Sequence, residues 1–324
     1  MANRAIEVDE VLARRRLRRR VSFWRVFALL VLVLGGAGLF AYVNEGALLP
    51  RAAPHVARVK IGGVIRNERE RLEMLESIGR SGARAVILSI DSPGGTVVGS
   101  QALYDGLRRL SERMPVVAVV EGMAASGAYI AAMGADHIVA PRNALVGSIG
   151  VIFQFPNFAE AMKTLGISYE EIKSSPLKAA PNMFEPPSEA ARAAVASLVS
   201  DSYDWFRELV AERRLLSGDK LAEVTDGRVF TAHQGLPLRL VDELGDERTA
   251  RAWLARERQV SADLPVRDWR TGRAGDEFGW LRGASIRLMS LAGMAEIGQI
   301  LLGSAEGAAA QLRLDGLLAL WHPH

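Results

Sequence analysis

Three features of the sequence contain residue types that together could catalyse acyl transfer. The first is Ser126, which lies among small residues, directly after an apolar stretch and before a short helical stretch. A hydroxyl at the amino end of a helix lies beside backbone N–H groups that have no intrahelical acceptor, at the positive end of the helix dipole. These surroundings suit a nucleophile whose product is an oxyanion. For this serine alone, a helix cap or a small packing residue is the alternative.

The other two features are a glycine pair, Gly94-Gly95, and a lysine, Lys178. The glycines follow a second apolar stretch, and glycine lets the backbone approach a ligand closely with its N–H groups directed at it. Lys178 lies among Pro, Leu and Ala, whereas Lys173 is closer to other charged residues. An ordinary strand–helix turn and a solvated loop lysine are the alternatives for these two features.

The elements that would position these residues alternate between strand and helix. The near-continuous apolar runs 83–90 and 114–120 predict strands of a buried parallel sheet. They place the glycine pair, in a turn at 91–95, and Ser126 at carboxyl ends of strands. This alternation predicts an α/β fold with right-handed crossovers and a sheet covered by helices. We expect further strands at 55–65, 137–140 and 147–153, an extended segment at 169–174, and helices at 68–80, 97–113, 128–135, 158–165 and 188–214.

Composition excludes several kinds of site. The chain has no cysteine, which rules out disulfides, a thiolate nucleophile and metal sites built on cysteine. Its five histidines are too scattered to indicate a metal cluster, so we expect neither metal nor cofactor. Residues 1–25 contain eight arginines and three acids, a net charge of +5, and subtracting this from the +3 of the whole chain leaves −2 elsewhere. A body that binds nucleic acid is therefore not expected.

The segment after these arginines predicts a membrane anchor. Residues 26–43 contain no charge, and as a helix they would extend about 27 Å, close to the ~30 Å of a bilayer core. Because arginine-rich flanks stay cytoplasmic, we expect residues 1–25 to be a cytoplasmic tail at the inner (plasma) membrane, with the catalytic domain extracytoplasmic, in the periplasm. A cleaved signal peptide is the alternative for the apolar segment, although its apolar region is usually only about 7–15 residues long. Residues 44–54 are predicted to be a linker.

Several motifs together resemble the signal peptide peptidase A (SppA) family of membrane-bound serine peptidases, in its short single-domain bacterial form. The resemblance extends from about residue 60 to 244 and rests on 91–95 (DSPGG), 123–129 (MAASGAY), 147–151 (GSIGV) and Lys178. It implies a ClpP/crotonase-like fold for residues 55–269. It also implies a role for each matching residue: Ser126 as nucleophile, Lys178 as general base, Ser148 as the residue that orients the lysine, and Gly94, Gly95 and Gly127 as donors of oxyanion-hole N–H groups. Ala128 departs from the glycine that many relatives have after Gly127.

A Ser–His–Asp triad is the alternative arrangement for such an enzyme. His137, beside Asp136, is the histidine closest to Ser126, but about ten helical residues carry the chain ~15 Å away, beyond hydrogen-bond reach. A lysine acts as a base only when it is neutral, and burial against apolar neighbours lowers its pKa. We expect Leu177, Ala179 and Met183 to provide such surroundings for Lys178.

The resemblance also implies the substrates and the assembly. It predicts an endopeptidase that degrades cleaved signal peptides and other membrane-associated peptides, bound along 95–98 and 149–151. It further predicts a homo-oligomeric ring, an octamer, in which serine and lysine meet across a protomer boundary. The alternatives are a crotonase-type acyl-CoA enzyme and a non-catalytic ring-forming membrane scaffold. Residues 270–324 are predicted to be a C-terminal tail, with an amphipathic or partner-packing helix at 286–302.

Overall fold

The computed structural model describes residues 24–31, 34–35, 53–271 and 318–320. The chain divides into two compact units, Met1–Ala53 and Pro54–His324. In the first unit, residues 24–31 and 34–35 are helical and exposed. Within the described ranges, no helix is both long and apolar enough to cross a bilayer. Much of the anchor predicted at 26–43 lies outside the described residues, as does the helix predicted at 286–302.

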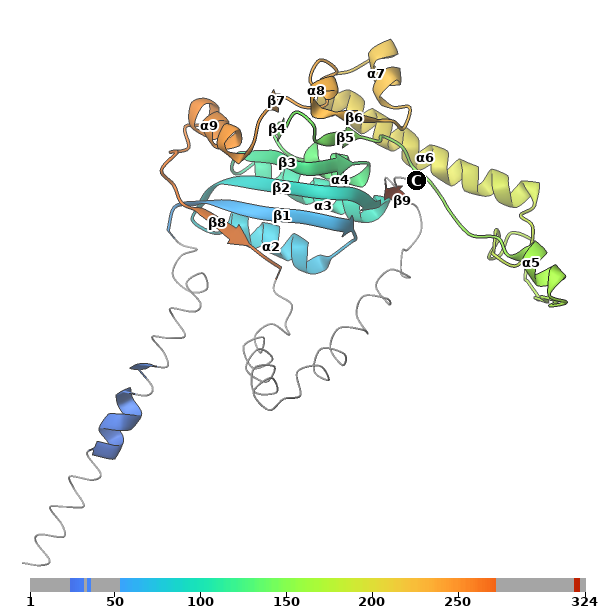
Figure 1. The fold of residues 1–324 in the computed structure, drawn as a ribbon, viewed down its shortest axis with the longest axis horizontal. Coiled ribbons are helices and arrows are strands. Elements are labelled where there is room, and N and C mark those ends of the chain that lie inside the picture. The colour runs from blue at the N-terminus through green and yellow to red at the C-terminus, as the bar shows by residue number, and fades with distance from the viewer. Residues whose placement is uncertain (1–23, 32–33, 36–52, 272–317, 321–324) are drawn as a thin grey trace, which may run out of the picture. The chain divides into compact units, whose positions relative to one another are not determined.

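One mixed sheet forms the centre of the second unit (Figure 1). Its main path runs in the order β6-β5-β3-β2-β1-β8, with β4 beside β3, β7 beside β4, and β9 beside β2. Among the pairings, only β5–β6 and β2–β9 in the described part are antiparallel, so the predicted α/β class with a largely parallel sheet is confirmed. The strands are β1 (His55–Ile65), β2 (Ala83–Thr96), β3 (Val116–Ala125), β4 (His137–Ala140), β5 (Leu145–Gly147), β6 (Val229–Thr231), β7 (Glu243–Leu244), β8 (Val266–Trp269) and β9 (Leu318–Leu320).

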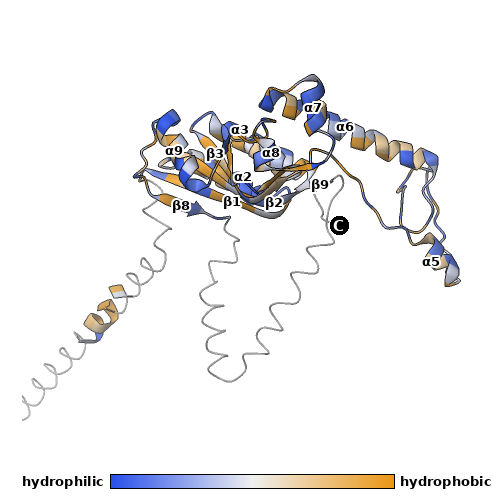
Figure 2. Ribbon diagram, turned by 45° about the horizontal axis from the view of Figure 1, so that its top comes forward, coloured by the Kyte–Doolittle hydropathy of each residue, from blue (hydrophilic) through white to orange (hydrophobic). Residues whose placement is uncertain are grey.

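Helices bury both faces of the central strands (Figure 2). On β2, Val86 and Leu88 pack into the larger core with helices α2, α3, α4 and α6, whereas Ile87 packs into the smaller core beneath α9. Since successive strand residues face opposite sides, burial of both faces explains the unbroken apolar run. The helices are α2 (Arg69–Gly79), α3 (Val97–Ser111), α4 (Gly127–Ala132), α5 (Ala159–Thr164), α6 (Glu189–Arg214), α7 (Gly218–Val224), α8 (Ala232–Gly235) and α9 (Glu247–Arg258).

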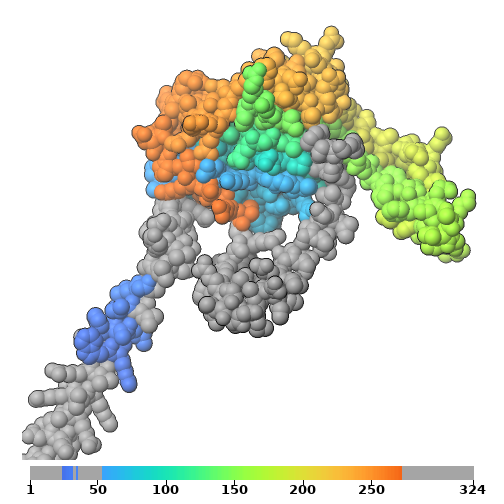
Figure 3. All heavy atoms as spheres, viewed as in Figure 1, coloured from blue at the N-terminus to red at the C-terminus, as the bar shows by residue number. Residues whose placement is uncertain are grey.

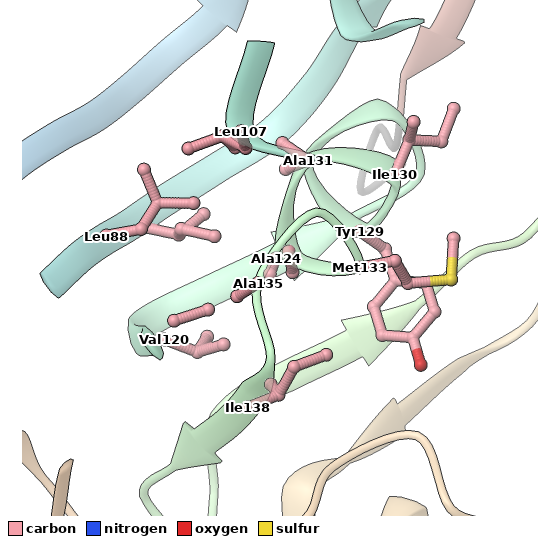
Figure 4. Close-up of a cluster of buried hydrophobic side chains, with 14 of the residues drawn as sticks. Leu88, Leu107, Val120, Ala124, Tyr129, Ile130, Ala131, Met133, Ala135 and Ile138 are labelled. Atoms are coloured by element: carbon pink, nitrogen blue, oxygen red, sulfur yellow. The ribbon is translucent and has the colours of Figure 1, made fainter. Parts of the chain in front are cut away.

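Helix α4 lies inside the larger core, and all six of its residues are buried (Figure 4). Its Tyr129 hydroxyl donates a hydrogen bond to the Leu240 carbonyl at 2.9 Å. Burial raises the pKa of Tyr129, so the phenol stays neutral. Packing on all sides fixes the position at which α4 begins, immediately after Ser126.

Three elements differ from the sequence prediction. β2 continues through 91–95, where a turn was predicted, because β1 pairs with it as far as Ile65↔Gly95 after a register shift. β5 ends at Gly147, where the predicted strand 147–153 was expected to begin. β9 is a strand within a tail for which no such element was predicted.

Residues 156–187, hereafter the arm, project from the sheet together with the amino-terminal part of α6 (Figures 1 and 3). The two ends of the arm meet, because the Phe158 amide donates to the Met183 carbonyl at 2.8 Å. Tyr169 stacks on Phe184 with ring centroids 4.7 Å apart. Lys173 forms ion pairs with Glu171 and Glu185. The arm is thus ordered by its own contacts.

Candidate active site

Ser126 occupies a sharp turn between the end of β3 and the start of α4. Its backbone has φ 53° and ψ −119°, a positive-φ conformation that residues other than glycine rarely adopt. The Ser126 amide donates to the Gly147 carbonyl at 2.7 Å, which ties the turn to the end of β5. Such backbone strain occurs preferentially at functional sites, where the surrounding structure enforces it. The sequence did not reveal this strain.

The start of α4 supplies N–H groups beside this serine. Because the helix begins at Gly127, the amides of Gly127 and Ala128 have no acceptor within the helix. The aligned peptide dipoles add partial positive charge at the same place. The arrangement suits Gly127 as an oxyanion donor, and it does not depend on whether residue 128 is Gly or Ala. The Ser126 hydroxyl itself lies 3.4 Å from the Gly150 carbonyl, a long hydrogen bond.

The two glycines of β2 differ in backbone conformation and in the backbone groups that they contact. Gly94 has φ 110°, which favours glycine, and its amide donates to the Ser92 hydroxyl at 3.1 Å. Gly95 pairs with Ile65, and a Cβ at Gly95 would overlap the Ile65 backbone. The Gly94 amide therefore has an acceptor within the chain, and the Gly95 backbone lies against that of β1.

Ser92 was not identified from the sequence. It is buried, accepts from Gly94, and donates to the Gly63 carbonyl at 2.6 Å. It thereby shapes the backbone around the glycine pair. The signal was present in the sequence, since a serine two residues before a glycine favours a local side-chain-to-backbone turn.

Ser148 directly follows β5 and lies at the same sheet edge as Ser126. It is buried and has φ 51°, a second left-handed serine. Its amide donates to the Arg228 carbonyl at 2.8 Å. Its hydroxyl forms no hydrogen bond with residues 53–271. It can therefore donate a hydrogen bond to another group, or accept one from it.

Lys178 lies in the arm, and within the described chain nothing brings it to Ser126. Its side chain is exposed and has no ion pair or hydrogen bond with the described residues. The burial expected from its apolar neighbours is wrong for the single chain, because Leu177 and Met183 are 48% and 39% exposed. Ala179, next in sequence, has φ 57°, so the backbone at this lysine is also strained.

Lys173 has the opposite environment. Hydrogen bonds from its ammonium to Glu171 and Glu185 raise the pKa of Lys173, so it stays charged. It is therefore unsuited to act as a base at neutral pH. The structure thus separates Lys173 from Lys178 as the sequence neighbourhood indicated.

His137 cannot complete a triad with Ser126. It pairs with Val117 near the start of β3, whereas Ser126 follows the end of that strand, and nine residues of strand amount to about 30 Å. The imidazole stacks on Trp253 with centroids 4.6 Å apart. Asp136 accepts from the Val116 amide. The prediction that His137 lies beyond hydrogen-bond reach of Ser126 is confirmed.

The described residues contain no group of three or more His, Cys, Asp or Glu side chains that could hold a metal ion. Around Ser126 the structure places the Gly147 carbonyl, which accepts from its amide, the Gly150 carbonyl, 3.4 Å from its hydroxyl, and the backbone N–H groups at the start of α4.

Comparison with known proteins identifies the family. Residues 108–261 match the model of peptidase family S49. The chain is 39% identical over 202 residues to "Putative protease slr0021" of Synechocystis sp., covering 62% of this chain and 73% of that protein. It is 32% identical over 213 residues to "Serine protease SPPA, chloroplastic" of Arabidopsis thaliana, covering 65% of this chain and 31% of that protein.

A solved structure, that of a mutant of the 1510-N membrane-bound stomatin-specific protease, is similar with a TM-score of 0.43 and 16% identity, covering 68% of this chain and all of that one. The chain spans less than a third of the Arabidopsis protein but nearly three quarters of the Synechocystis one. The match to the family model, together with the coverage of nearly three quarters of the Synechocystis protein, confirms the resemblance seen in the sequence motifs. The chain belongs to peptidase family S49, the signal peptide peptidase A family, and is a serine endopeptidase.

Proposed function

We propose that this serine endopeptidase uses a Ser126/Lys178 dyad that is completed between two copies of the chain in a ClpP/crotonase-like ring. The observation that carries the proposal is the strained turn at Ser126, directly before the amides that begin α4 and two residues after Ala124, which pairs with Ser92 just before the glycine pair of β2. This is the arrangement that an acyl-transfer nucleophile needs. Ser148 and Gly147 border the same turn.

The exposed apolar surface of the arm supports completion by a second copy. Ile172 is fully exposed, and Leu165 is 73% exposed. Contiguous exposed apolar surface of this kind marks an interaction site. Docking of the arm on a neighbouring copy would bury the surroundings of Lys178 and lower the pKa of its amine. Further large apolar side chains exposed on the arm are Phe158, Ile167, Tyr169, Leu177, Met183 and Phe184.

In the proposed reaction, neutral Lys178 of one copy accepts the proton of the Ser126 hydroxyl of another. The serine oxygen attacks the peptide carbonyl carbon, and the oxyanion that forms accepts hydrogen bonds from the Gly127 and Gly95 amides. The lysine ammonium then gives its proton to the leaving amine as the acyl-enzyme forms. Water, deprotonated by the same lysine, hydrolyses the ester and releases the serine. Ser148 orients the lysine amine throughout.

The proposal includes a membrane location and its substrates. Residues 26–43 would anchor the protein in the inner membrane, with residues 1–25 in the cytoplasm and the peptidase domain in the periplasm. Peptides left in the membrane after signal-sequence cleavage are then the substrates within reach. We expect apolar, extended peptides to bind by strand pairing.

Mixing two inactive variants tests the dyad and its division between copies. Ser126→Ala and Lys178→Ala are each expected to lose hydrolysis of an internally quenched apolar peptide. Co-assembly at equal amounts should restore about a quarter of wild-type activity, since a quarter of the sites would combine an intact serine with an intact lysine. Lys163→Ala, which removes a different lysine of the arm, should be fully active and is the matched control.

Two results would contradict the proposal. Wild-type activity in Lys178→Ala would remove the lysine from the reaction. Failure of the mixed assembly to gain activity, with both variants assembling to wild-type size, would show that serine and lysine do not meet between copies.

A further inference from the structure

Ser92 lies in β2 at the position where that strand changes its pairing. β2 runs between β1 and β3 (Figure 1). Its register with β1 shifts between Gly62 and Val64, and its register with β3 shifts between Ile90 and Ser92. The pair Ser92↔Ala124 is the last one between β2 and β3. Ser92 therefore marks the end of regular pairing, just before the glycine pair.

The buried hydroxyl of Ser92 connects β1 to the glycine pair. It donates a hydrogen bond to the Gly63 carbonyl at 2.6 Å and accepts one from the Gly94 amide at 3.1 Å. The Gly94 carbonyl lies farther from the hydroxyl, at 3.4 Å, so the single hydroxyl proton is directed at Gly63. One side chain thus ties the backbone of β1 to that of β2 beside the register shift.

Both glycines that Ser92 contacts have positive φ, 63° at Gly63 and 110° at Gly94. Glycine adopts many backbone conformations at little cost, so the residue type alone does not fix these angles. The Gly94 amide is held by Ser92, and the Gly95 backbone is held by its pairing with Ile65. The peptide group between the two glycines is therefore restrained from both sides, and the Ser92 hydroxyl supplies one of these restraints.

An oxyanion site requires a restraint of this kind. Its donors stabilise the transition state only when they already point at the position of the oxyanion, at about 2.7–3.1 Å. An unrestrained glycine pair can rotate away from that direction at little cost. A fixed partner for the Gly94 amide removes this freedom before a substrate binds.

We infer that Ser92 is a positioning residue: by holding the Gly94 amide, its hydroxyl keeps the Gly95 amide directed at the oxygen of the reacting carbonyl. The bond to the Gly63 carbonyl holds the hydroxyl itself in place. The inference rests on the proposed function, in which Gly95 donates to the oxyanion. Ser92 acts through Gly95 and takes no part in proton transfer. Its effect belongs to the transition state, because only there does the oxygen carry the negative charge.

Removal of the hydroxyl in the full-length chain tests this role. Ser92→Ala deletes both hydrogen bonds and adds no bulk. Deletion of an oxyanion donor costs about 10²- to 10³-fold in kcat, and misdirection of a donor should cost less. For an internally quenched apolar peptide, we expect kcat to fall about 10- to 100-fold with KM unchanged. Ser89→Ala is the matched control and should match wild type, because Ser89 is a buried serine of β2 whose hydroxyl donates to the Glu121 carboxylate.

A peptide aldehyde distinguishes an effect on the oxyanion from a general loss of structure. Its adduct with Ser126 carries an oxygen at the oxyanion position, whereas a peptide of the same sequence that ends in a carboxamide forms no such adduct. Ser92→Ala should weaken inhibition by the aldehyde about 10-fold or more and leave inhibition by the carboxamide unchanged. Equal loss of affinity for both inhibitors would overturn the inference, because it would indicate a distorted peptide-binding surface.

Wild-type kcat in a folded Ser92→Ala enzyme would also overturn the inference. If circular dichroism shows that Ser92→Ala does not fold, Ser92→Cys keeps the shape of the side chain with a weaker donor and acceptor. Its kcat should fall at least about threefold at unchanged KM, and wild-type kcat in this variant would overturn the inference. A wild-type enzyme that cleaves no peptide would overturn the proposed function, whereas equal activity of wild type and Ser92→Ala would overturn only the role of Ser92.

Discussion

Ser126 and Ser148 directly follow two residues that are paired across the sheet, Ala125 at the end of β3 and Gly147 at the end of β5. Both serines have left-handed backbone conformations, with φ of 53° and 51°. Parallel pairing of their strands places both serines at one edge of the sheet. Two serines 22 residues apart in sequence thus follow neighbouring strands at the same edge.

The strained backbone at Ser126 is expected to lower the free energy of unfolding of the protein. Glycine adopts φ 53°, ψ −119° with little strain, so Ser126→Gly should stabilise the fold by about 1 kcal/mol while abolishing peptide hydrolysis. Ser126→Ala retains a Cβ and should abolish hydrolysis without this gain. Thermal unfolding of both variants measures the difference, and equal melting temperatures would show that the turn is unstrained.

Ser148→Ala should impair the reaction without impairing the fold. If its hydroxyl orients the amine of Lys178, kcat should fall about 10- to 100-fold, and the pH at which kcat is half-maximal should move. KM should stay near the wild-type value, because Ser148 is not proposed to hold the peptide. Ser168→Ala, at an exposed serine of the arm, is the control, and an unchanged pH profile in Ser148→Ala would argue against an orienting role.

Gly95→Ala should be strongly destabilising for a reason separate from catalysis. A Cβ at Gly95 would overlap the Ile65 backbone, so β1 or β2 would have to shift, at a cost of more than about 3 kcal/mol. Gly62→Ala is the matched control, because its Cβ would meet only the Asp91 carbonyl, at 3.8 Å. Denaturant unfolding distinguishes the two, and similar stabilities would contradict the close approach of β1 and β2.

A charge on the apolar arm should prevent assembly. Ile172 is fully exposed in the single chain, so Ile172→Glu should leave the folded chain unchanged by circular dichroism. Burial of an unpaired carboxylate between copies is costly, and sedimentation should therefore show smaller species and activity should fall more than about 10-fold. Ser168→Glu adds the same charge at a polar exposed position of the arm, and equal assembly of both variants would exclude the apolar arm surface as an interface.

The pKa of Tyr169 should show whether its hydrogen bond to Glu171 stabilises the arm. Its hydroxyl donates to Glu171 at 3.0 Å, and this hydrogen bond raises the pKa of Tyr169. The contribution of this bond to the stability of the arm is therefore complete below the usual tyrosine pKa of about 10 and is lost as pH rises through the raised pKa. Glu171→Gln should lower the pKa of Tyr169 toward its ordinary value, and Glu170→Gln should not. The ring ¹³C shift of labelled tyrosine, assigned with Tyr169→Phe, measures this pKa.

The sequence by itself determined the α/β class and most of the alternation of strands and helices between residues 55 and 214, and it singled out the serine, the lysines and the glycines as candidates. Those features depend on local patterns: apolar runs buried on both faces, small residues around Ser126, and a histidine separated from it along the chain. A periodic pattern of this kind is a property of neighbouring residues, so it can be seen without coordinates.

Only the tertiary structure decided how these residues relate in space. The extension of β2 through 91–95 follows from pairing with β1, the strained turn at Ser126 from the packing of α4, and the exposure of Lys178 from the projection of the arm. Pairing of residues 318–320 with β2 joins segments more than 200 residues apart. Such long-range contacts leave no periodic signal in a single sequence. Which segment pairs with a strand edge depends on how the whole chain packs and not on the residues adjacent to that strand in the sequence.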